Sequence, residues 1–397
     1  MASEQSTTAI LERLIGFASV SSESNLDIVS WIEDYLSQYG VASRRIPDRS
    51  GRKASLLATI GPDDRAGVVL SAHTDVVPVA GQNWTTSPFA ATRSADRIIG
   101  RGATDMKGFI ASVLAHVPDF KAAATATPVH IALSYDEEVG CLGAPDLVAE
   151  IAGLRETPLL CIVGEPTGLG IGYAHKGKVA RRVVVTGRGG HSALPHRAAN
   201  AVSAAARIAA FLDELALRTA RDGPHNAAFD PPYTTIHVGS LHGGSALNFV
   251  PDRAALEFEV RYTPGADAAA LLAQVDAAIA RERDRLKAQA PEADITVEDM
   301  ASYPALMTAP DSPAVRAAQR LARHAGPAMT VSFGTEAGIY AQAGIPTVVC
   351  GPGDIARAHK ADEWIAVTEL AAADTMMQRL ASQLGKPAKV WMNDDKQ

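Results

Sequence analysis

Four short, nearly continuous apolar runs constrain the fold of this chain most strongly. They are AGVVLSAH (66–73), PVHIALSYDEE (128–138), PLLCIVGE (158–165) and IPTVVCG (345–351). Apolar runs of this length without alternation are typical of parallel strands that are buried on both faces. Helical patterns lie between them, at 106–117 and 141–151. The sequence therefore predicts an α/β fold with a central, mostly parallel sheet flanked by helices.

The pattern changes near residue 179, which suggests a second domain. A strand, VARRVVVTGR, is followed by an alanine-rich helix, two strands, a second helix and the strand ADITVED, and α/β patterning returns near residue 303. This order is the split βαβ, or ferredoxin-like, arrangement, which forms a compact α+β unit. We expect a discontinuous catalytic domain, 1–178 and 301–397, and an inserted domain, 179–300. The alternative is an unbroken single domain.

Composition excludes several classes of protein. With 47% hydrophobic and 20% charged residues the chain is typical of a globular protein, and no apolar run approaches the roughly 20 residues of a membrane span. A net charge of -7 without a basic stripe argues against nucleic acid. Three cysteines are too few for a disulfide framework, so we expect a cytoplasmic location. The polar C-terminal stretch GKPAKVWMNDDKQ is expected to fray.

Acidic residues and histidines follow the predicted strands. His73, Glu138 and Glu165 end the first three apolar runs. Because ligands collect beyond the carboxyl ends of strands in open α/β sheets, we expect these side chains to converge. Asp105, in GRGATDMKG, and His359 are further candidates. Taken singly, each could be a helix cap or a hydrogen-bonded structural residue, but together they offer nitrogen and carboxylate oxygen without thiolate, which suits Zn²⁺, Co²⁺ or Mn²⁺.

Five ligands are too many for one catalytic zinc ion and fit two ions that share a carboxylate. Such a pair holds a water and lowers its pKa toward about 7. A separate carboxylate must then take the proton, and this explains the adjacent glutamates of SYDEEVG: Glu138 would be a ligand and Glu137 the general base. In a surface loop the same pair would have no function. Asp75, in HTD, would accept a hydrogen bond from the imidazole of His73 and orient it.

The motifs SAHTDVVP, GRGATDMKG, SYDEEVG, GEPT, GRGGHSALP and AHKADEW resemble those of the M20 metallopeptidase family, and the resemblance runs nearly end to end. It implies that His73 and Glu165 bind one metal ion. It also implies that Glu138 and His359 bind the other, and that Asp105 bridges the two ions and precedes a cis peptide bond. Every metal position expected from the family holds the expected residue type.

The same resemblance implies roles for the inserted domain as a lid and dimerisation domain. His191, in GGHSALPH, would cross to the partner subunit of a homodimer and help polarise the scissile carbonyl. A polar loop histidine is the alternative. Asn248 and Arg261 match substrate contacts of the family, and an arginine suits a carboxylate because it donates two parallel hydrogen bonds.

Within the family, Glu165 and the stretches YAHKGK, SFGTEAGIYAQAGIPTVVCGPG and AHKADEWI resemble the branch that releases acetate from N2-acetyl-L-ornithine in arginine biosynthesis. Glu336, in GTEAG, would pair with the substrate's side-chain ammonium. The alternative is a succinyl-diaminopimelate desuccinylase, an aminoacylase or a carboxypeptidase of the same family. A succinyl group would require another cation, for which Lys176, Lys178 and Arg182 are candidates. A metal-binding scaffold without activity is the remaining alternative.

Overall fold

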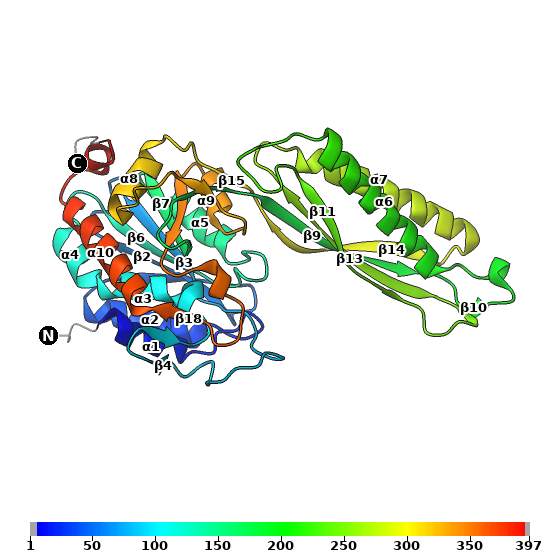
Figure 1. Cartoon of the computed structure of the whole chain (residues 1–397), viewed down its shortest axis with the longest axis horizontal. Helices are drawn as coiled ribbons and strands as arrows, with labels where there is room; N and C mark the ends of the chain where they lie inside the picture. Colours follow the sequence, from blue (N-terminus) through cyan, green and yellow to red (C-terminus); the bar gives the residue numbers. More distant parts are fainter. Residues whose placement is uncertain (1–5, 394–397) are drawn as a thin grey trace. The chain divides into compact units, whose positions relative to one another are not determined.

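The chain divides into two compact units in a computed structural model that describes residues 6–393. The first unit extends to His175 and resumes at Leu306, and the second runs from Lys176 to Ala305 (Figure 1). These limits lie close to the changes of pattern in the sequence, and they differ because the strands at the junctions extend beyond their apolar residues. None of the helices within residues 6–393 has the length and apolarity that a membrane crossing requires.

A nine-stranded sheet forms the centre of the first unit. Its strands are β1 (Ser43–Pro47), β2 (Ala54–Ile60), β3 (Val68–His73), β6 (Val129–Ser134), β7 (Leu160–Pro166), β8 (Gly172–His175), β15 (Leu306–Met307), β16 (Met329–Thr330) and β17 (Thr347–Gly351). The order is β1-β2-β6-β3-β7-β17-β8-β15, and β16 pairs with β8. The neighbours β6, β3, β7 and β17 run parallel. These are the four predicted strands, so the prediction of a mostly parallel central sheet is confirmed.

Helices cover both faces of this sheet. They are α1 (Thr7–Ile15), α2 (Leu26–Gln38), α3 (Gly108–Ala115), α4 (Val117–Ala123), α5 (Ala144–Ala152), α8 (Pro313–Ala322), α9 (Ala337–Gln342), α10 (Val367–Gln383) and α11 (Ala388–Met392). A small antiparallel sheet of β4 (Thr92–Arg93), β5 (Arg97–Ile99) and β18 (Trp364–Ala366) completes the unit.

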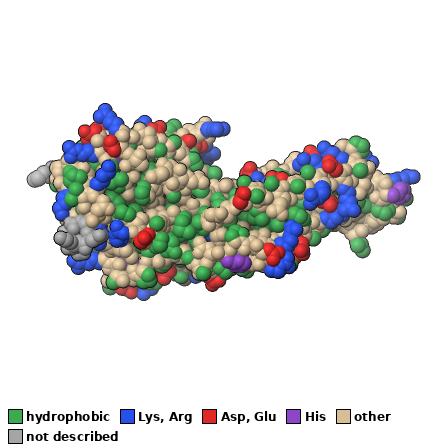
Figure 2. All heavy atoms as spheres, turned by 90° about the horizontal axis from the view of Figure 1, so that it is seen from above, with side chains coloured by type: hydrophobic (Ala, Val, Ile, Leu, Met, Phe, Trp, Pro, Cys, Tyr) green, Lys and Arg blue, Asp and Glu red, His purple; other side chains and the backbone are tan. Residues whose placement is uncertain are grey.

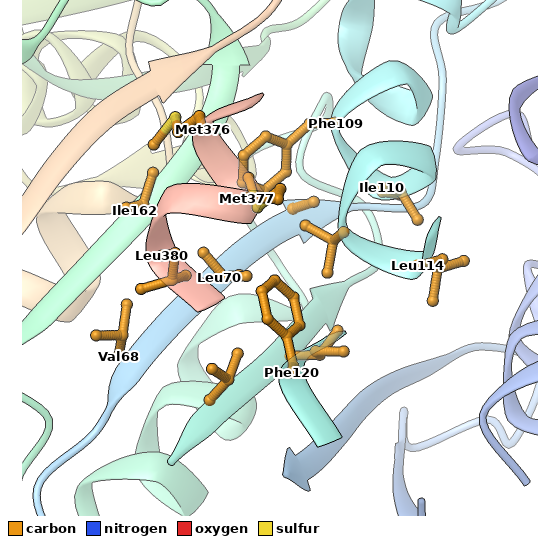
Figure 3. Close-up of a cluster of buried hydrophobic side chains, with 14 of the residues drawn as sticks. Val68, Leu70, Phe109, Ile110, Leu114, Phe120, Ile162, Met376, Met377 and Leu380 are labelled. Atoms are coloured by element: carbon orange, nitrogen blue, oxygen red, sulfur yellow. The ribbon is translucent and has the colours of Figure 1, made fainter. Parts of the chain in front are cut away.

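Alternate residues of the central strands face the two helical layers. Val68 and Leu70 of β3 pack with residues of α3, α4 and α10, as Figure 3 shows. Val69, between them, belongs to a second cluster with residues of α5 and α9. Because successive side chains of a strand point to opposite faces, a strand covered on both sides must be apolar throughout. This explains the unbroken apolar runs.

The second unit is a four-stranded antiparallel sheet with two long helices. The strands are β9 (Gly177–Thr186), β11 (Thr235–Gly243), β13 (Arg253–Tyr262) and β14 (Asp294–Tyr303), in the order β11-β13-β9-β14, and the helices are α6 (Ala201–Asp222) and α7 (Ala268–Gln289). Two short strands of this unit, β10 (Gly190–His191) and β12 (Phe249–Val250), form a separate antiparallel pair. Residues of both helices and of the sheet form a core separate from those of the first unit.

The chain passes between the units on paired strands. His175 of β8 lies opposite Leu306 of β15 in the first unit. Lys178 of β9 lies opposite Tyr303 of β14 in the second. The exit and the return of the chain are therefore neighbours in both units.

The C-terminal stretch differs from its prediction. Residues Ala388–Met392 form α11, and the side chains of Trp391 and Met392 are buried in the core of the first unit. The expected fraying is wrong for this segment because its few apolar residues find a packing surface, and residues 394–397 lie outside the described residues. Elsewhere, charged side chains of both signs are interspersed on the face that Figure 2 shows.

Candidate metal centre

The carboxyl ends of three neighbouring parallel strands bring the predicted ligands together. His73 is the last residue of β3, and Glu165 lies next to the end of β7. Strand β6 ends at Ser134 and leads directly into the segment that carries Glu137 and Glu138. Since β6, β3 and β7 are adjacent in the sheet, residues distant in sequence meet at one edge.

Asp105 lies between two imidazoles. Its Oδ1 is 3.1 Å from Nε2 of His73, and its Oδ2 is 3.2 Å from Nε2 of His359. Oε1 of Glu165 lies 3.8 Å from Nε2 of His73. Oε2 of Glu138 lies 3.0 Å from Nε2 of His359. The five side chains thus form two groups that share the carboxylate of Asp105.

The neighbouring glutamates both lie near His73 but otherwise face different members of this cluster. Glu137 offers an oxygen that lies, with ligand atoms of His73 and Glu165, within a mutual distance of 4.8 Å. Glu138 forms an equally compact set with His73 and Asp105. Glu137 is therefore next to the candidate ligands without being needed to complete either pair around Asp105.

The main chain around Asp105 is irregular. Ala103–Lys107 form a π-helical turn before α3, and the peptide bond between Asp105 and Met106 is cis, as expected. The residue at the N-cap of α3 is Lys107, and no side chain caps that helix. The alternative that Asp105 serves as a helix cap is therefore not what the structure contains.

Burial dominates the electrostatics of the glutamates. It raises the pKa of Glu165 and of Glu137 well above the usual range. Burial and the charge of Asp105 raise the pKa of Glu138 to about 7, although the hydrogen bond from His359 opposes this rise. Carboxylates crowded in a buried site remain ionised only where positive charge is nearby.

The pKa values of the two histidines are raised as well, because the surrounding carboxylates stabilise the protonated imidazoles. Burial alone would lower the pKa of His73, but hydrogen bonds with Asp105 and Asp75 and the charge of Glu165 outweigh it and raise that pKa well above its usual value. Hydrogen bonds with Asp105 and Glu138 raise the pKa of His359 to about 10. The positive charge of the protonated imidazoles thus balances the negative charge of the carboxylates. Two divalent cations would supply that charge directly, and the nitrogen and oxygen donors fit them.

Asp75 orients its neighbours differently from the prediction. Nδ1 of His73 is 2.8 Å from the main-chain carbonyl oxygen of Asp75 and 3.5 Å from its carboxylate. The carboxylate accepts hydrogen bonds from the main-chain N–H groups of Glu137 and Glu138, at 3.1 and 3.3 Å, and from Oγ of Ser21, at 2.7 Å. Asp75 therefore fixes both the imidazole and the main chain of the adjacent glutamates.

Glu363 is a buried residue of this region that sequence reasoning missed. Its Oε1 accepts hydrogen bonds from the main-chain N–H groups of Thr104 and Asp105, at 2.9 and 3.0 Å. Its Oε2 lies 2.7 Å from Nη1 of Arg101. The available signal was an acidic residue four positions after His359 in the motif AHKADEW.

Glu336 is buried in the first unit. It is 1% exposed, and its carboxylate accepts hydrogen bonds from Oγ of Ser71, at 2.5 Å, and Oγ of Ser134, at 2.6 Å. These serines belong to β3 and β6, shortly before His73 and the glutamate segment. A substrate contact for Glu336 stays a prediction, and the geometry gives it internal partners.

The remaining predicted residues belong to the second unit. His191 is exposed in β10, and its Nδ1 accepts a hydrogen bond from the N–H of Ala193 at 3.1 Å. The N–H of the following Ser192 donates to the carbonyl of Asn248 at 3.1 Å, so His191 and Asn248 lie on adjoining segments. Arg261 forms an ion pair with Glu259 at 2.7 Å. Their predicted contacts with substrate and partner subunit stay predictions.

A mostly parallel sheet that carries two imidazole and carboxylate groups at its carboxyl edge is the arrangement of a metal-dependent hydrolase. Residues 69–383 match the peptidase family M20/M25/M40, and the chain belongs to this family. The resemblance noted in the sequence is thereby confirmed.

Similar proteins extend over almost the whole chain. An acetylornithine deacetylase of Edwardsiella ictaluri is 32% identical over 94% of this chain and 96% of its own. The M20 family metallo-carboxypeptidase Sso-CP2 of Sulfolobus solfataricus is similar in fold, with a TM-score of 0.77, 18% identity and coverage of 97% and 100% of the two chains. A dinuclear metal-binding peptidase of the M20 family, YXEP of Bacillus subtilis, aligns with a TM-score of 0.60, 17% identity and coverage of 94% and 96%.

Proposed function

We propose that this protein hydrolyses N2-acetyl-L-ornithine to acetate and L-ornithine, a step of arginine biosynthesis, in the cytoplasm. Membership of the M20 family supports hydrolysis of a small peptide or amide substrate. The choice of substrate is supported by the relative named acetylornithine deacetylase, which aligns with 94% of the chain. The single observation that carries the proposal is the convergence of five candidate ligands around Asp105 with Glu137 beside them.

The proposed cofactors are two divalent metal ions, with Zn²⁺ as first choice and Co²⁺ or Mn²⁺ as substitutes. His73 and Glu165 would hold one ion, and Glu138 and His359 the other. Asp105 would serve both, since each of its oxygens faces a different imidazole. The ions would act as Lewis acids that lower the pKa of water and polarise the amide carbonyl.

Glu137 would move the proton. It would accept a proton from the attacking water as the new C–O bond forms, and then donate that proton to the nitrogen of ornithine as the amide C–N bond breaks. Burial raises the pKa of Glu137 well above the usual range. The carboxyl product keeps the water oxygen, and the amine leaves with the proton.

The second unit would complete the site in a homodimer. We assign His191 to stabilising the developing oxyanion, and Asn248 and Arg261 to the substrate. Sedimentation analysis tests the dimer, and a monomer at micromolar concentration would contradict it.

Glu336 would pair with the ammonium of ornithine, and a Glu336→Gln variant that kept the full preference over N-acetyl-L-methionine would argue against this.

The three cations considered for a succinyl substrate have partners within the second unit. Nζ of Lys178 is 3.0 Å from Glu259, and Nζ of Lys176 donates to the carbonyls of Pro231 and Tyr233. Arg182 lies 3.8 Å from Glu257. Arg261 has a comparable partner in Glu259, so these contacts do not separate the two acyl groups, and the choice of acetyl is supported by the relative named acetylornithine deacetylase.

The first experiment compares four substrates with the Zn²⁺- or Co²⁺-loaded protein. They are N2-acetyl-L-ornithine, N-succinyl-diaminopimelate, N-acetyl-L-methionine and a dipeptide, each with a chelated control. We expect the highest kcat/KM for acetylornithine and loss of turnover on chelation. A preference for another substrate would replace the proposed substrate while keeping the metal chemistry, and no turnover of any of the four would favour a scaffold.

The adjacent glutamates provide a matched pair of variants. Glu137→Gln is expected to lower kcat at least 100-fold, as loss of a general base does, while two metal ions per chain remain bound. Glu138→Gln should instead lower the metal content, measured by atomic absorption after dialysis. Equal loss of metal in both variants would assign Glu137 to the ligands and overturn its role as the base.

A further inference from the structure

One buried arginine connects the main-chain segments of two candidate metal ligands. Arg101 is 1% exposed, and its guanidinium has two polar partners. Nη1 lies 2.7 Å from Oε2 of Glu363, and Nη2 lies 2.6 Å from Oε1 of Gln82. The ring of Trp84 lies 5.1 Å from its guanidinium carbon. A planar guanidinium can hold two such partners at a fixed angle, which a lysine ammonium cannot.

The first arm of this connection reaches Asp105. Glu363 uses one oxygen for Arg101 and the other for the main-chain N–H groups of Thr104 and Asp105. Oγ1 of Thr104 also donates to the carbonyl of Trp364, the residue after Glu363, at 2.7 Å. The irregular turn that carries Asp105 is thereby held against the segment 363–364 at several points.

The second arm reaches His359. Nε2 of Gln82 donates to the main-chain carbonyl of His359 at 3.0 Å. Oε1 of Gln82 accepts from both Arg101 and Nε1 of Trp84, so the orientation of its amide is fixed at both ends. The side chain of His359 is 52% exposed, whereas that of His73 is 1% exposed. Packing around the ring therefore contributes little to the position of His359, and its main-chain contacts must supply more.

We propose that Arg101 is a positioning residue that, through Glu363 and Gln82, sets the placement of Asp105 relative to His359. This inference rests on the proposed pair of metal ions. The arm to His359 acts on one of them, because His359 faces Asp105 and Glu138, whereas the ligands His73 and Glu165 lie on strands that the core fixes directly. Loss of the arm to His359 should therefore weaken one ion and spare the other.

The decisive variant is Gln82→Ala, which removes the arm to His359 and leaves the buried pair of Arg101 and Glu363 intact. Metal-free protein is titrated with Co²⁺, and the two binding steps are followed by visible absorbance and equilibrium dialysis. Glu138→Gln and Glu165→Gln identify which step belongs to which ion. We expect Gln82→Ala to weaken the step that Glu138→Gln abolishes by about 10- to 100-fold, the usual effect of removing an outer partner of a metal ligand. The other step should change less than threefold.

Arg101→Lys is a second variant, since it keeps a positive charge beside Glu363 but cannot hold both partners. It should weaken both steps, because Asp105 would serve both ions. Arg320→Met is the matched control: it removes an arginine that donates to the carbonyls of Trp391 and Met392, so it tests a general loss of stability. Wild-type protein that bound no pair of ions would overturn the proposed function together with this inference. Two ions in the wild type and unchanged steps in Gln82→Ala would overturn the inference alone, as would equal weakening of both steps in that variant.

Discussion

At the scale of single residues, the buried His130, which lies outside the candidate site, should make the stability of the fold depend on pH. It lies on β6, is 2% exposed, and its Nδ1 is 2.9 Å from Oγ1 of Thr59. Its Nε2 is buried without a hydrogen-bond partner among residues 6–393. Burial lowers the pKa of His130 from 6.5 to about 4. The neutral ring is thus the form that the fold accepts.

The sign of the effect follows from proton linkage. Between the lowered pKa in the folded state and 6.5 in the unfolded state, the unfolded chain binds more protons. The contribution of His130 is fully present above pH 6.5 and is lost as the pH falls toward 4. In His130→Gln, the decrease in the free energy of unfolding between pH 7 and 4.5 should be smaller by about 2–3 kcal/mol. Urea unfolding at several pH values measures this.

Exposed His196→Gln is the control for that experiment, because it removes a histidine that solvent already surrounds. Its profile should follow that of the wild type. Parallel profiles for His130→Gln and the wild type would mean that the buried ring is not what makes the fold sensitive to acid.

Residue types at strand ends were predictable, whereas their supports were not. His73 and Glu165 could be found because each ends an apolar run, and Glu138 because it comes shortly after one. Arg101 and Gln82 lie in irregular segments, where no periodicity relates a residue to its burial or its partners. An arginine between two glycines reads as exposed, and only the fold reveals that it is surrounded.

At the scale of elements, fully buried strands gave a stronger signal than partly exposed ones. Every residue of β3 and of β6 is buried, so their sequences are nearly continuous apolar runs. Strand β1, at the sheet edge, contains two arginines and was not predicted. Edge strands need only one apolar face or none, so periodicity identifies them poorly.

Helix α11 was missed because it is short and lies in a mostly polar stretch. Its contribution to stability can be measured. Trp391 is 4% exposed, and its Nε1 lies 3.4 Å from Oγ1 of Thr127. Trp391→Ala is expected to lower the free energy of unfolding of the first unit by about 3–5 kcal/mol, the usual cost of removing a buried aromatic side chain. Urea unfolding followed by circular dichroism measures this.

Lys389→Ala, at an exposed position of the same helix, is the comparison. It should change the free energy of unfolding by less than about 0.5 kcal/mol. A similarly small effect of Trp391→Ala would indicate that α11 separates from the core in solution, as the polar sequence suggested.

At the scale of the whole molecule, two units were predictable but the order of the strands was not. The sheet places β3 between β6 and β7, although a large part of the first unit's sequence separates β3 from both. Periodicity reports whether a strand is buried, not which strand lies beside it. That the candidate ligands lie close together was therefore an inference from the sequence, and the structure supplies the distances between them.

The second unit should fold by itself. Its core is formed by its own helices and sheet, and the two ends of the segment lie on the paired strands β9 and β14. A fragment of residues 176–305 is expected to have circular dichroism typical of a mixed α/β protein and to unfold cooperatively in urea. A gradual change without a transition would mean that this unit depends on the first for its structure.

The paired positions of His175 and Leu306 have a consequence for the segment between them. Because the chain leaves and returns on neighbouring strands, a hairpin would be enough to join them in the first unit. A longer segment in place of that hairpin adds little to the entropic cost of closing the loop. The segment between can be lengthened or exchanged without moving the strands that carry the candidate metal ligands. A chain with a simple turn at this point is therefore sterically reasonable, and it would keep the candidate metal ligands while lacking the groups proposed for the second unit.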